Sequence, residues 1–470
     1  MTAAIVTPKA TFVARRRALH AKLSGPVLIA AGEAPSRNYA ANRYPFRASS
    51  HFLYLVGRPL SGAALLLANG RSVLFTHPPD PEDALWHGPR PALDAVSHEL
   101  GFADEGGDVR PLDSLDAALA ALGRDVGTLP TQDGASSTWL GERLGRSVVA
   151  RSGARLTDAR DASLADAMIA LRLRHDDEAV AQLRFAASVS AEAHLAGMRA
   201  TAPGGSERDV HAAMLAVLRR AGLEDAYGPI VTVHGEVLHS DDHSQPLRDG
   251  DLLLADVGGE TPEGWAADIT RVWPVSGRFS PTQCALYDVV LEAQLAAIDA
   301  VRPGRRYREV HDVAKRGLVE GLVRLGIFRG EVDGLLERGA ASLFFPHGIG
   351  HLLGLDVHDM EDLGDRAGYA PGRTRSATFG DAFLRLDREL EPGMAVTIEP
   401  GFYQVPGILG DPARTGPLGD DLRREVLARY ADVRGIRIED DVRVTDSGHE
   451  VLTEAVPKRV DEVEAVMRNR

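Results

Sequence analysis

Short apolar runs alternate with helix-like polar stretches over residues 1–165. The runs Pro26–Ala31, Ala63–Leu67 and Ser72–Phe75 are bounded by Gly, Pro and Asn, which is typical of buried strands. The stretch Leu115–Leu122 has the pattern of a connecting helix. This alternation predicts an α/β layer around a mostly buried sheet.

The pattern changes close to residue 160. Residues Ser163–Met198 carry apolar side chains on a period of about 3.6 residues together with dense charge, which predicts one long helix joining two domains. We therefore divide the chain into an N-terminal domain of residues 1–165 and a C-terminal domain of residues 166–470.

The C-terminal domain mixes helices with widely separated strands. A helix is expected over Ser206–Ala221, and another runs from the cap at Ser280 to Val301. Strands are expected at Leu252–Val257, Ile269–Val275, Ala395–Ile398 and Ile436–Val444. Strands drawn from such distant parts of the chain indicate an α+β domain.

Charge and cysteine content exclude several classes of protein. The 470 residues include 53 Lys and Arg against 67 Asp and Glu, and this net charge of −14 argues against nucleic acid or an anionic membrane as a partner. The lone Cys284 excludes an intramolecular disulfide and a CxxC zinc site. No signal-like or membrane-spanning apolar run is evident, so we expect a cytoplasmic protein.

Two aspartates flank a turn-rich segment. Asp256 ends one apolar run, Asp268 opens the next, and Gly258–Gly264 lies between them. A hairpin brings the two side chains together, and two adjacent buried carboxylates cannot both ionise without a counter-charge. The arrangement suits a metal site, although two carboxylates in water at a hairpin end fit the same pattern.

Three histidines gather in the glycine-rich segment Phe344–Asp359, at positions 347, 351 and 358. A single histidine on an apolar face is usually a core residue, but three within twelve residues indicate a functional site. The segment lacks the HExxH zinc motif, and its glycines disfavour a regular helix.

Two glutamates lie at or in expected strands of the same domain. Glu399 follows an apolar strand and precedes Pro400, which favours an extended backbone. Glu439 shares one face of its strand with Arg437. Taken singly, each glutamate is better explained as an edge-strand charge.

The acidic residues and one histidine together indicate a metal centre. Four carboxylates and one imidazole suit a pair of Mn²⁺-like ions better than tetrahedral zinc. Two ions that share bridging carboxylates can ionise a water for attack at neutral pH. The members of the set are Asp256, Asp268, His351, Glu399 and Glu439.

This set resembles the ligands of the pita-bread metallopeptidases, a family that includes aminopeptidase P, prolidase and methionine aminopeptidase, with creatinase as a metal-free relative. The resemblance covers nearly the whole chain and is strongest over residues 227–456. It implies a smaller α/β N-terminal domain and an α+β pita-bread catalytic domain. It also implies two divalent ions, with Mn²⁺ expected and Co²⁺ or Zn²⁺ as alternatives, and a homodimer or higher homo-oligomer in which the N-terminal domain borders a neighbour's active site.

The resemblance also implies a role for each site residue in hydrolysis of Xaa-Pro bonds by a hydroxide held between the two ions. Asp268 and Glu439 bridge the ions, and Glu399 shuttles a proton to the leaving proline nitrogen. The other implied roles are contact with substrate by His239, His347 and His358, stabilisation of the tetrahedral intermediate by His239 and His358, support of the carboxylates by Arg437, and positioning of the water and a ligand by Tyr227 and Thr270.

Two departures from the family pattern stand out. The two aspartates are usually eleven positions apart, and here they are twelve apart, which we attribute to one extra residue at the hairpin tip. The segment around His239 reads LHSDD in place of the commoner LHY, which keeps His239 but leaves the expected substrate contacts beside it open.

The choice between two Xaa-Pro activities depends mainly on one arginine. Leu384–Met394 resembles the prolidase segment that binds the free carboxylate of the substrate's proline, with Arg385 at the clamp position. The insert Asp411–Tyr430 also resembles prolidase. We therefore expect a dipeptidase acting on proline-containing dipeptides, with aminopeptidase P acting on longer peptides as the alternative. Arg385 is also explained as a surface residue paired with Asp387 or Glu389.

Two further functions were weighed on the same fold. One is a non-catalytic binding protein, and the other is creatinase-like hydrolysis without metal. All five ligand positions carry the expected residue type, which disfavours both.

Overall fold

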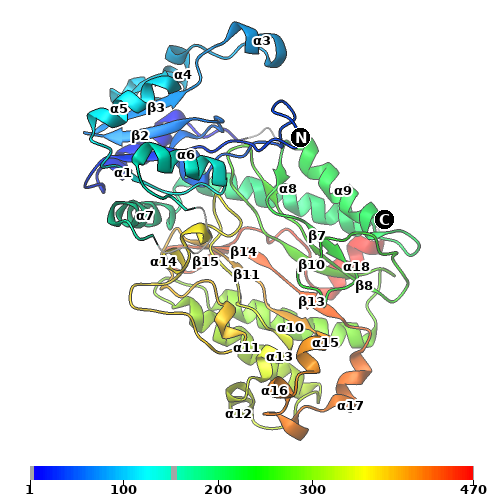
Figure 1. Cartoon of the computed structure of the whole chain (residues 1–470). Coiled ribbons are helices and arrows are strands. Elements are labelled where there is room, and N and C mark those ends of the chain that lie inside the picture. Colours follow the sequence, from blue (N-terminus) through cyan, green and yellow to red (C-terminus); the bar gives the residue numbers. More distant parts are fainter. Residues whose placement is uncertain (1–4, 150–155, 469–470) are drawn as a thin grey trace. The chain divides into compact units, whose positions relative to one another are not determined.

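The computed structural model describes residues 5–149 and 156–468, and the chain forms two compact units (Figure 1). The N-terminal unit consists of Ile5–Leu173 and Met360–Ala367. The C-terminal unit consists of Arg174–Asp359 and the described residues from 368 onward. The division therefore falls between Leu173 and Arg174, beyond the boundary placed after residue 165, and a short later segment returns to the N-terminal unit.

The helix expected over Ser163–Met198 is two helices, so that prediction was wrong. Helix α7 (Ala159–Arg172) belongs to the N-terminal unit, and α8 (Asp177–Ala200) belongs to the C-terminal unit. The carboxylate of Asp176 accepts a hydrogen bond from the backbone N–H of Ala179 and caps α8. This cap starts a new helix, and the unit boundary falls in the connection before it.

The N-terminal unit is built on a five-stranded mixed sheet in the order β4-β3-β2-β1-β5. Each apolar run expected to be a strand forms one, and β1, β2 and β3 pair antiparallel. The elements are α1 Lys9–His20, β1 Val27–Ala30, α2 Ser50–Val56, β2 Ala64–Ala68, β3 Arg71–Thr76, α3 Pro81–His87, α4 Leu93–Glu99, β4 Asp108–Pro111, α5 Leu115–Ala121, β5 Gly127–Thr128, α6 Gly134–Leu144 and α7. Leu28, Leu66, Phe75, Leu119 and Leu140 pack in its core. The predicted α/β layer is confirmed.

In the C-terminal unit, short strands lie between the helix pair α8 and α9 and the helix pair α10 and α11 (Figure 1). The helices are α8, α9 Glu207–Arg220, α10 Pro281–Asp299, α11 Tyr307–Arg324, α12 Val332–Glu337, α13 Ala340–Phe344, α15 Pro406–Leu409, α16 Pro412–Thr415, α17 Arg424–Leu427 and α18 Val460–Arg468, while α14 Asp365–Gly368 spans the junction of the units. The strands are β6 Glu224–Asp225, β7 Ile230–Thr232, β8 Leu252–Asp256, β9 Gly259–Glu260, β10 Thr270–Pro274, β11 Ala395–Ile398, β12 Gly401–Tyr403, β13 Gly435–Arg437, β14 Asp440–Val444 and β15 His449–Val451. The expected α+β architecture is confirmed.

Four of these strands form one interrupted antiparallel ladder. Strand β11 pairs with β14, and β12 pairs with β13, in a single register that places Glu399 opposite Glu439. The ladder breaks there because Pro400 accepts a hydrogen bond from Ile438 but has no N–H to return. The strand expected over Ile436–Val444 is therefore two strands.

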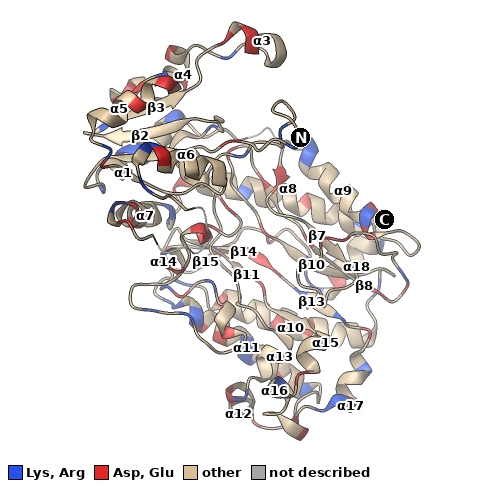
Figure 2. Ribbon diagram, in the orientation of Figure 1, with Lys and Arg blue, Asp and Glu red and all other residues tan. Residues whose placement is uncertain are grey.

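Charged residues of both signs are spread over the helices of each unit (Figure 2), so the acid excess is not gathered on one element. Within residues 5–149 and 156–468, no helix combines the length and apolar character needed to cross a lipid bilayer.

Candidate metal centre

The hairpin of β8 and β10 brings the two predicted aspartates together. Thr270 lies opposite Asp256 in the pairing, and Asp268 precedes Thr270 by two residues, so all three lie at one end of the hairpin. Pairing continues toward the tip, where Glu260 bridges Ala266, so the twelve-residue spacing is accommodated without a break in register.

The interruption of the second ladder supplies the two glutamates. Glu399 and Glu439 face each other where β11 ends and β14 begins. The backbone N–H of Glu439 donates to the carbonyl oxygen of Thr270 at 3.1 Å, which joins this ladder to the hairpin. Carboxylates far apart in the sequence therefore converge through backbone pairing.

The histidine segment runs beside β11 as an extended chain. The N–H of Thr397 donates to the carbonyl of His351 at 3.0 Å, and the N–H of Glu399 donates to the carbonyl of Ile349 at 2.8 Å. Gly350 has φ +153°, and a Cβ at this position would collide with the backbone of Thr397. Glycine is therefore required for the close approach that brings His351 to the site.

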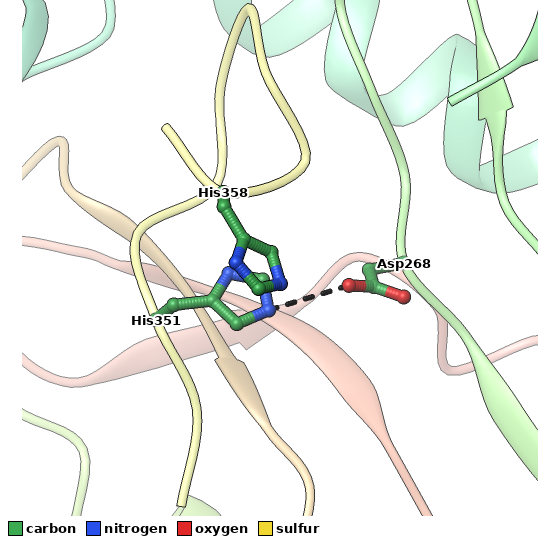
Figure 3. A group of neighbouring side chains, drawn as sticks. All are labelled: Asp268, His351 and His358. Carbon is green, nitrogen blue, oxygen red and sulfur yellow. Dashed lines mark ion pairs between the residues drawn. The ribbon is translucent and has the colours of Figure 1, made fainter. Parts of the chain in front are cut away.

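Figure 3 shows the rings of His351 and His358 directed toward Asp268. Nε2 of His351 lies 3.4 Å from Oδ2 of Asp268 and 3.7 Å from Oε1 of Glu399. Its Nδ1 lies 3.0 Å from the carbonyl oxygen of Leu352, so Nε2 is the ring nitrogen that faces the carboxylates and is placed to bind a metal ion. The ring of His358 lies 3.9 Å from that of His351, centroid to centroid.

The donor atoms fit two divalent ions. Three overlapping groups each place one possible ligand atom per residue within 4.8 Å of the others. Four buried or half-buried carboxylates form a hard, oxygen-rich set of the kind that binds Mn²⁺-like ions. The groups are Asp256, Asp268 and Glu439; His351, Glu399 and Glu439; and Asp268, His351 and His358. His358, expected to contact substrate and to stabilise the tetrahedral intermediate, thus also lies within ligand distance.

Arg437 and two hydroxyl groups orient the acidic side chains. Arg437 donates to Oδ2 of Asp256 at 2.5 Å and to Oγ1 of Thr270 at 2.9 Å. The hydroxyl of Thr270 donates to Glu439 at 2.6 Å, and that of Tyr227 donates to Asp256 at 2.6 Å. Arg437, Thr270 and Tyr227 therefore lie where the sequence predicts supporting residues.

Burial dominates the electrostatics of the centre. It raises the pKa of Glu399 to about 7 and that of Asp256 to about 6, and it raises the pKa of Glu439 well above its usual value. Burial alone would lower the pKa of His351, but the hydrogen bond with Asp268 and the charge of Glu399 raise it to about 9. The site holds more acidic groups than its own positive groups balance, as expected of a cation site.

A cavity of about 420 Å³ opens onto the centre. His239, His347, His358 and Arg385 line it beside the acidic residues. Burial and the charge of Arg437 lower the pKa of His347 to about 3. Its Nδ1 lies 2.8 Å from the carbonyl of Gly348 and its Nε2 lies 2.9 Å from the Tyr403 hydroxyl, so this neutral ring offers substrate mainly its carbon edge.

The alternative partners of Arg385 are held by other arginines. Arg306 donates to both carboxylate oxygens of Asp387 at 2.6 Å, and Arg373 donates to Glu389 at 3.2 Å. Both carboxylates therefore have arginine partners other than Arg385, and Arg385 itself lies in the wall of the cavity.

Two residues near the centre were not predicted. Tyr403 receives a hydrogen bond from Arg437 at 3.1 Å, and the carboxylate of Asp441 accepts the backbone N–H of Asp268 at 3.1 Å. Asp441 could have been predicted from the sequence, because residues two apart in a strand share a face and Asp441 follows Glu439 by two positions. Tyr403 could not, because its contact depends on the β12–β13 register.

Comparison with known proteins agrees with this geometry. Residues 181–446 match metallopeptidase family M24, and residues 12–130 match the N-terminal domain of aminopeptidase P. The chain is 33% identical to the Xaa-Pro aminopeptidase of Escherichia coli over 97% of both chains. It is 34% identical to a probable Xaa-Pro aminopeptidase of Talaromyces marneffei, covering 90% of this chain and 88% of that protein.

A solved structure shares the fold over the same extent. The aminopeptidase PepP of Pseudomonas aeruginosa matches with a TM-score of 0.79 and 36% identity over 99% of each chain. The expected order of domains, with the pita-bread domain second, is thereby confirmed. The chain belongs to metallopeptidase family M24, as a metallopeptidase with an aminopeptidase P-type N-terminal domain.

Proposed function

We propose that the protein is a Xaa-Pro aminopeptidase, which removes the residue before proline from the N-terminus of a peptide. The observation that carries the proposal is the convergence of four carboxylates and His351 on one cavity that is also lined by His239 and His358. The relatives named above are Xaa-Pro aminopeptidases, which favours this activity over the dipeptidase that the sequence resemblance placed first.

Two divalent ions held by the five-residue set, with Mn²⁺ the proposed species, would polarise the scissile carbonyl and supply a nucleophilic water at neutral pH. Glu399 would serve as the general base that takes a proton from the attacking water and then as the general acid that gives it to the leaving proline nitrogen. His239 and His358, on the cavity wall, donate hydrogen bonds to the carbonyl oxygen as negative charge develops.

The remaining residues keep this machinery in place. Arg437 donates hydrogen bonds to Asp256 and to the hydroxyl of Thr270, and that hydroxyl donates to Glu439. Arg437 thus orients Asp256 of the hairpin directly and Glu439 of the second ladder through Thr270. Tyr227 restrains the other oxygen of Asp256. A homo-oligomeric state and a cytoplasmic location stay predictions.

A dipeptidase is the second candidate, and the position of Arg385 in the same cavity favours it. A fixed guanidinium at one substrate length from the centre would bind the carboxylate of a dipeptide's proline. Replacing Arg385 with Ala should then reduce cleavage of Xaa-Pro far more than cleavage of Xaa-Pro-Xaa, whereas an aminopeptidase should lose little on either substrate.

A peptide-length series with Mn²⁺ present tests the proposal. We expect hydrolysis of Ala-Pro-Ala and of longer Ala-Pro peptides. If the protein hydrolyses Ala-Pro but none of the longer peptides, the aminopeptidase proposal is wrong and the dipeptidase is the better description. No hydrolysis of any of them would overturn both.

A further inference from the structure

A second cavity, of about 250 Å³, adjoins the centre. It shares His239, Asp256, Asp268 and His358 with the larger cavity, so one substrate can extend into both from the scissile bond. The larger cavity holds the residues that we propose to carry out the hydrolysis. The part of the substrate that the smaller cavity binds is still to be assigned.

The two cavities differ in charge and polarity. The larger one is lined by Arg385 and Arg437 and by the apolar side chains of Phe379, Phe383 and Ile408. The smaller one has no Lys or Arg among the described residues that line it, and it adds Ser240 and Asp241.

This difference fixes the direction of a bound peptide. The apolar proline ring and the chain beyond it, which ends in a carboxylate, match the wall with Phe379, Phe383 and Arg385. The N-terminal residue, which carries the cationic amino group, then lies toward the acidic cavity. Asp241 lines that cavity beyond the residues shared with the larger one.

Asp241 and its neighbour Asp242 differ in their contacts. Both oxygens of Asp242 accept hydrogen bonds from Ser244, from the backbone N–H at 2.9 Å and from the hydroxyl at 2.8 Å. Asp241 is exposed and makes no hydrogen bond or ion pair within residues 5–149 and 156–468. Its carboxylate is therefore open to a cation from the substrate.

We propose that the smaller cavity receives the side chain of the residue before proline and that Asp241 selects a basic side chain there. This inference rests on the proposed Xaa-Pro activity. Asp241 belongs to the LHSDD segment in which this chain departs from the commoner family pattern, so the preference is a property of this chain.

The test compares kcat/KM for Arg-Pro-Ala, Met-Pro-Ala and Glu-Pro-Ala, whose first side chains differ mainly in charge. We expect Arg-Pro-Ala to exceed Met-Pro-Ala about fivefold at low ionic strength, the size of an exposed ion pair, and Glu-Pro-Ala to be poorest. The advantage should appear in KM and shrink as salt is added.

Asp241→Asn and Asp242→Asn change the net charge of the protein equally, so comparing them distinguishes the roles of the two neighbouring aspartates. Asp241→Asn should bring the Arg-to-Met ratio close to one, and Asp241→Arg should make Glu-Pro-Ala the preferred substrate. Asp242→Asn is the control and should keep the wild-type ratio. Unchanged thermal midpoints establish that each variant is folded.

A wild-type ratio near one, or a ratio that survives Asp241→Asn, would overturn the inference while leaving Xaa-Pro cleavage intact. Loss of the ratio in Asp242→Asn would also overturn it, because the selection would then depend on the loop. Absence of cleavage of all three peptides by the wild-type protein would instead refute the proposed function.

Discussion

Glu439 and Asp440 are neighbours in the chain, yet each belongs to a different buried cluster of charges. Asp440 accepts hydrogen bonds from Arg271 at 2.7 Å and from Lys458 at 2.6 Å. Burial alone would raise the pKa of Asp440, but these two cations hold it well below its usual range. Glu439 shares its site with three other carboxylates, and burial together with the charge of Asp268 raises its pKa.

The difference shows what each cluster is for. All five guanidinium donors of Arg271 can be satisfied, because its N–H groups reach backbone carbonyls as well as Asp440. In that cluster the single carboxylate of Asp440 has two cationic partners from the protein itself, so it needs no bound ion. The cluster around Glu439 keeps an excess of acid, which costs stability unless cations enter. The excess is therefore the signature of the metal centre.

Removing one acidic member should break the metal cluster with the largest effect on function. For Asp268→Asn we expect kcat/KM on Ala-Pro-Ala with Mn²⁺ to fall at least about 10⁴-fold, equivalent to about 5 kcal/mol of transition-state stabilisation. Burial alone would raise the pKa of Asp268, but the hydrogen bond with His351 lowers it, so the chelator-treated variant should stay folded with a somewhat lower thermal midpoint than wild type. Activity within tenfold of wild type would refute the role of Asp268.

Removing Asp440 should have the opposite profile. Asp440→Asn leaves Arg271 buried beside a neutral partner, and we expect a loss of about 3–5 kcal/mol in the free energy of unfolding by urea. Asp411→Asn, which removes a partly exposed partner of Arg414, is the control and should change it little. If Asp440→Asn changes the free energy of unfolding as little as Asp411→Asn does, the cluster of Asp440 and Arg271 does not stabilise the fold.

The hydroxyl that connects Arg437 with Glu439 offers a smaller perturbation. Thr270→Val should weaken Mn²⁺ binding about 10- to 100-fold in calorimetric titration, because Glu439 loses its orienting hydrogen bond. Thr270→Ser keeps the hydroxyl and should restore most of the affinity. Equal affinity in both variants would show that packing, and not the hydroxyl, matters.

The smallest expected effect is a pH dependence in the chelator-treated protein. The pKa of Glu399 is raised from its ordinary 4.5 to about 7, so the native state binds this proton more tightly than the unfolded chain does. The stability of wild type relative to Glu399→Gln should therefore fall as the pH rises from 4.5 to 7. Buried His347, whose pKa is lowered, makes stability rise with pH in both proteins. Its contribution therefore largely cancels when the stability of Glu399→Gln is subtracted from that of wild type. A rising difference would contradict the assigned shift.

The sequence predicted the local elements and the ligand residues because both are written in short patterns. The hairpin around Asp256 and Asp268 follows from apolar runs flanking a turn, and the histidine segment is conspicuous for its glycines. A strand pattern does not reveal where a ladder is interrupted, so the break at Pro400 and the pairing of Glu399 with Glu439 came only from the structure.

The helix boundary at Asp176 and the contacts that support the metal centre were also not predictable from local sequence patterns. The apolar period continues across Asp176, so periodicity alone joined α7 to α8, and the cap that separates them is a side-chain contact. Tyr403 and Asp441 depend on the register of strands distant in sequence. Arg385 was predicted from a resemblance, and its place in the cavity leaves the choice of substrate length to experiment.

The most direct test of the account is the number of metal ions that the acid-rich cluster binds. Metal content by mass spectrometry after dialysis against Mn²⁺, together with calorimetric titration of the chelator-treated protein, should give two ions per chain. Hydrolysis of Ala-Pro-Ala should be lost on chelation and regained with Mn²⁺. A protein that binds no divalent ion at this cluster, or that hydrolyses the peptide equally well in excess chelator, would contradict the central claim.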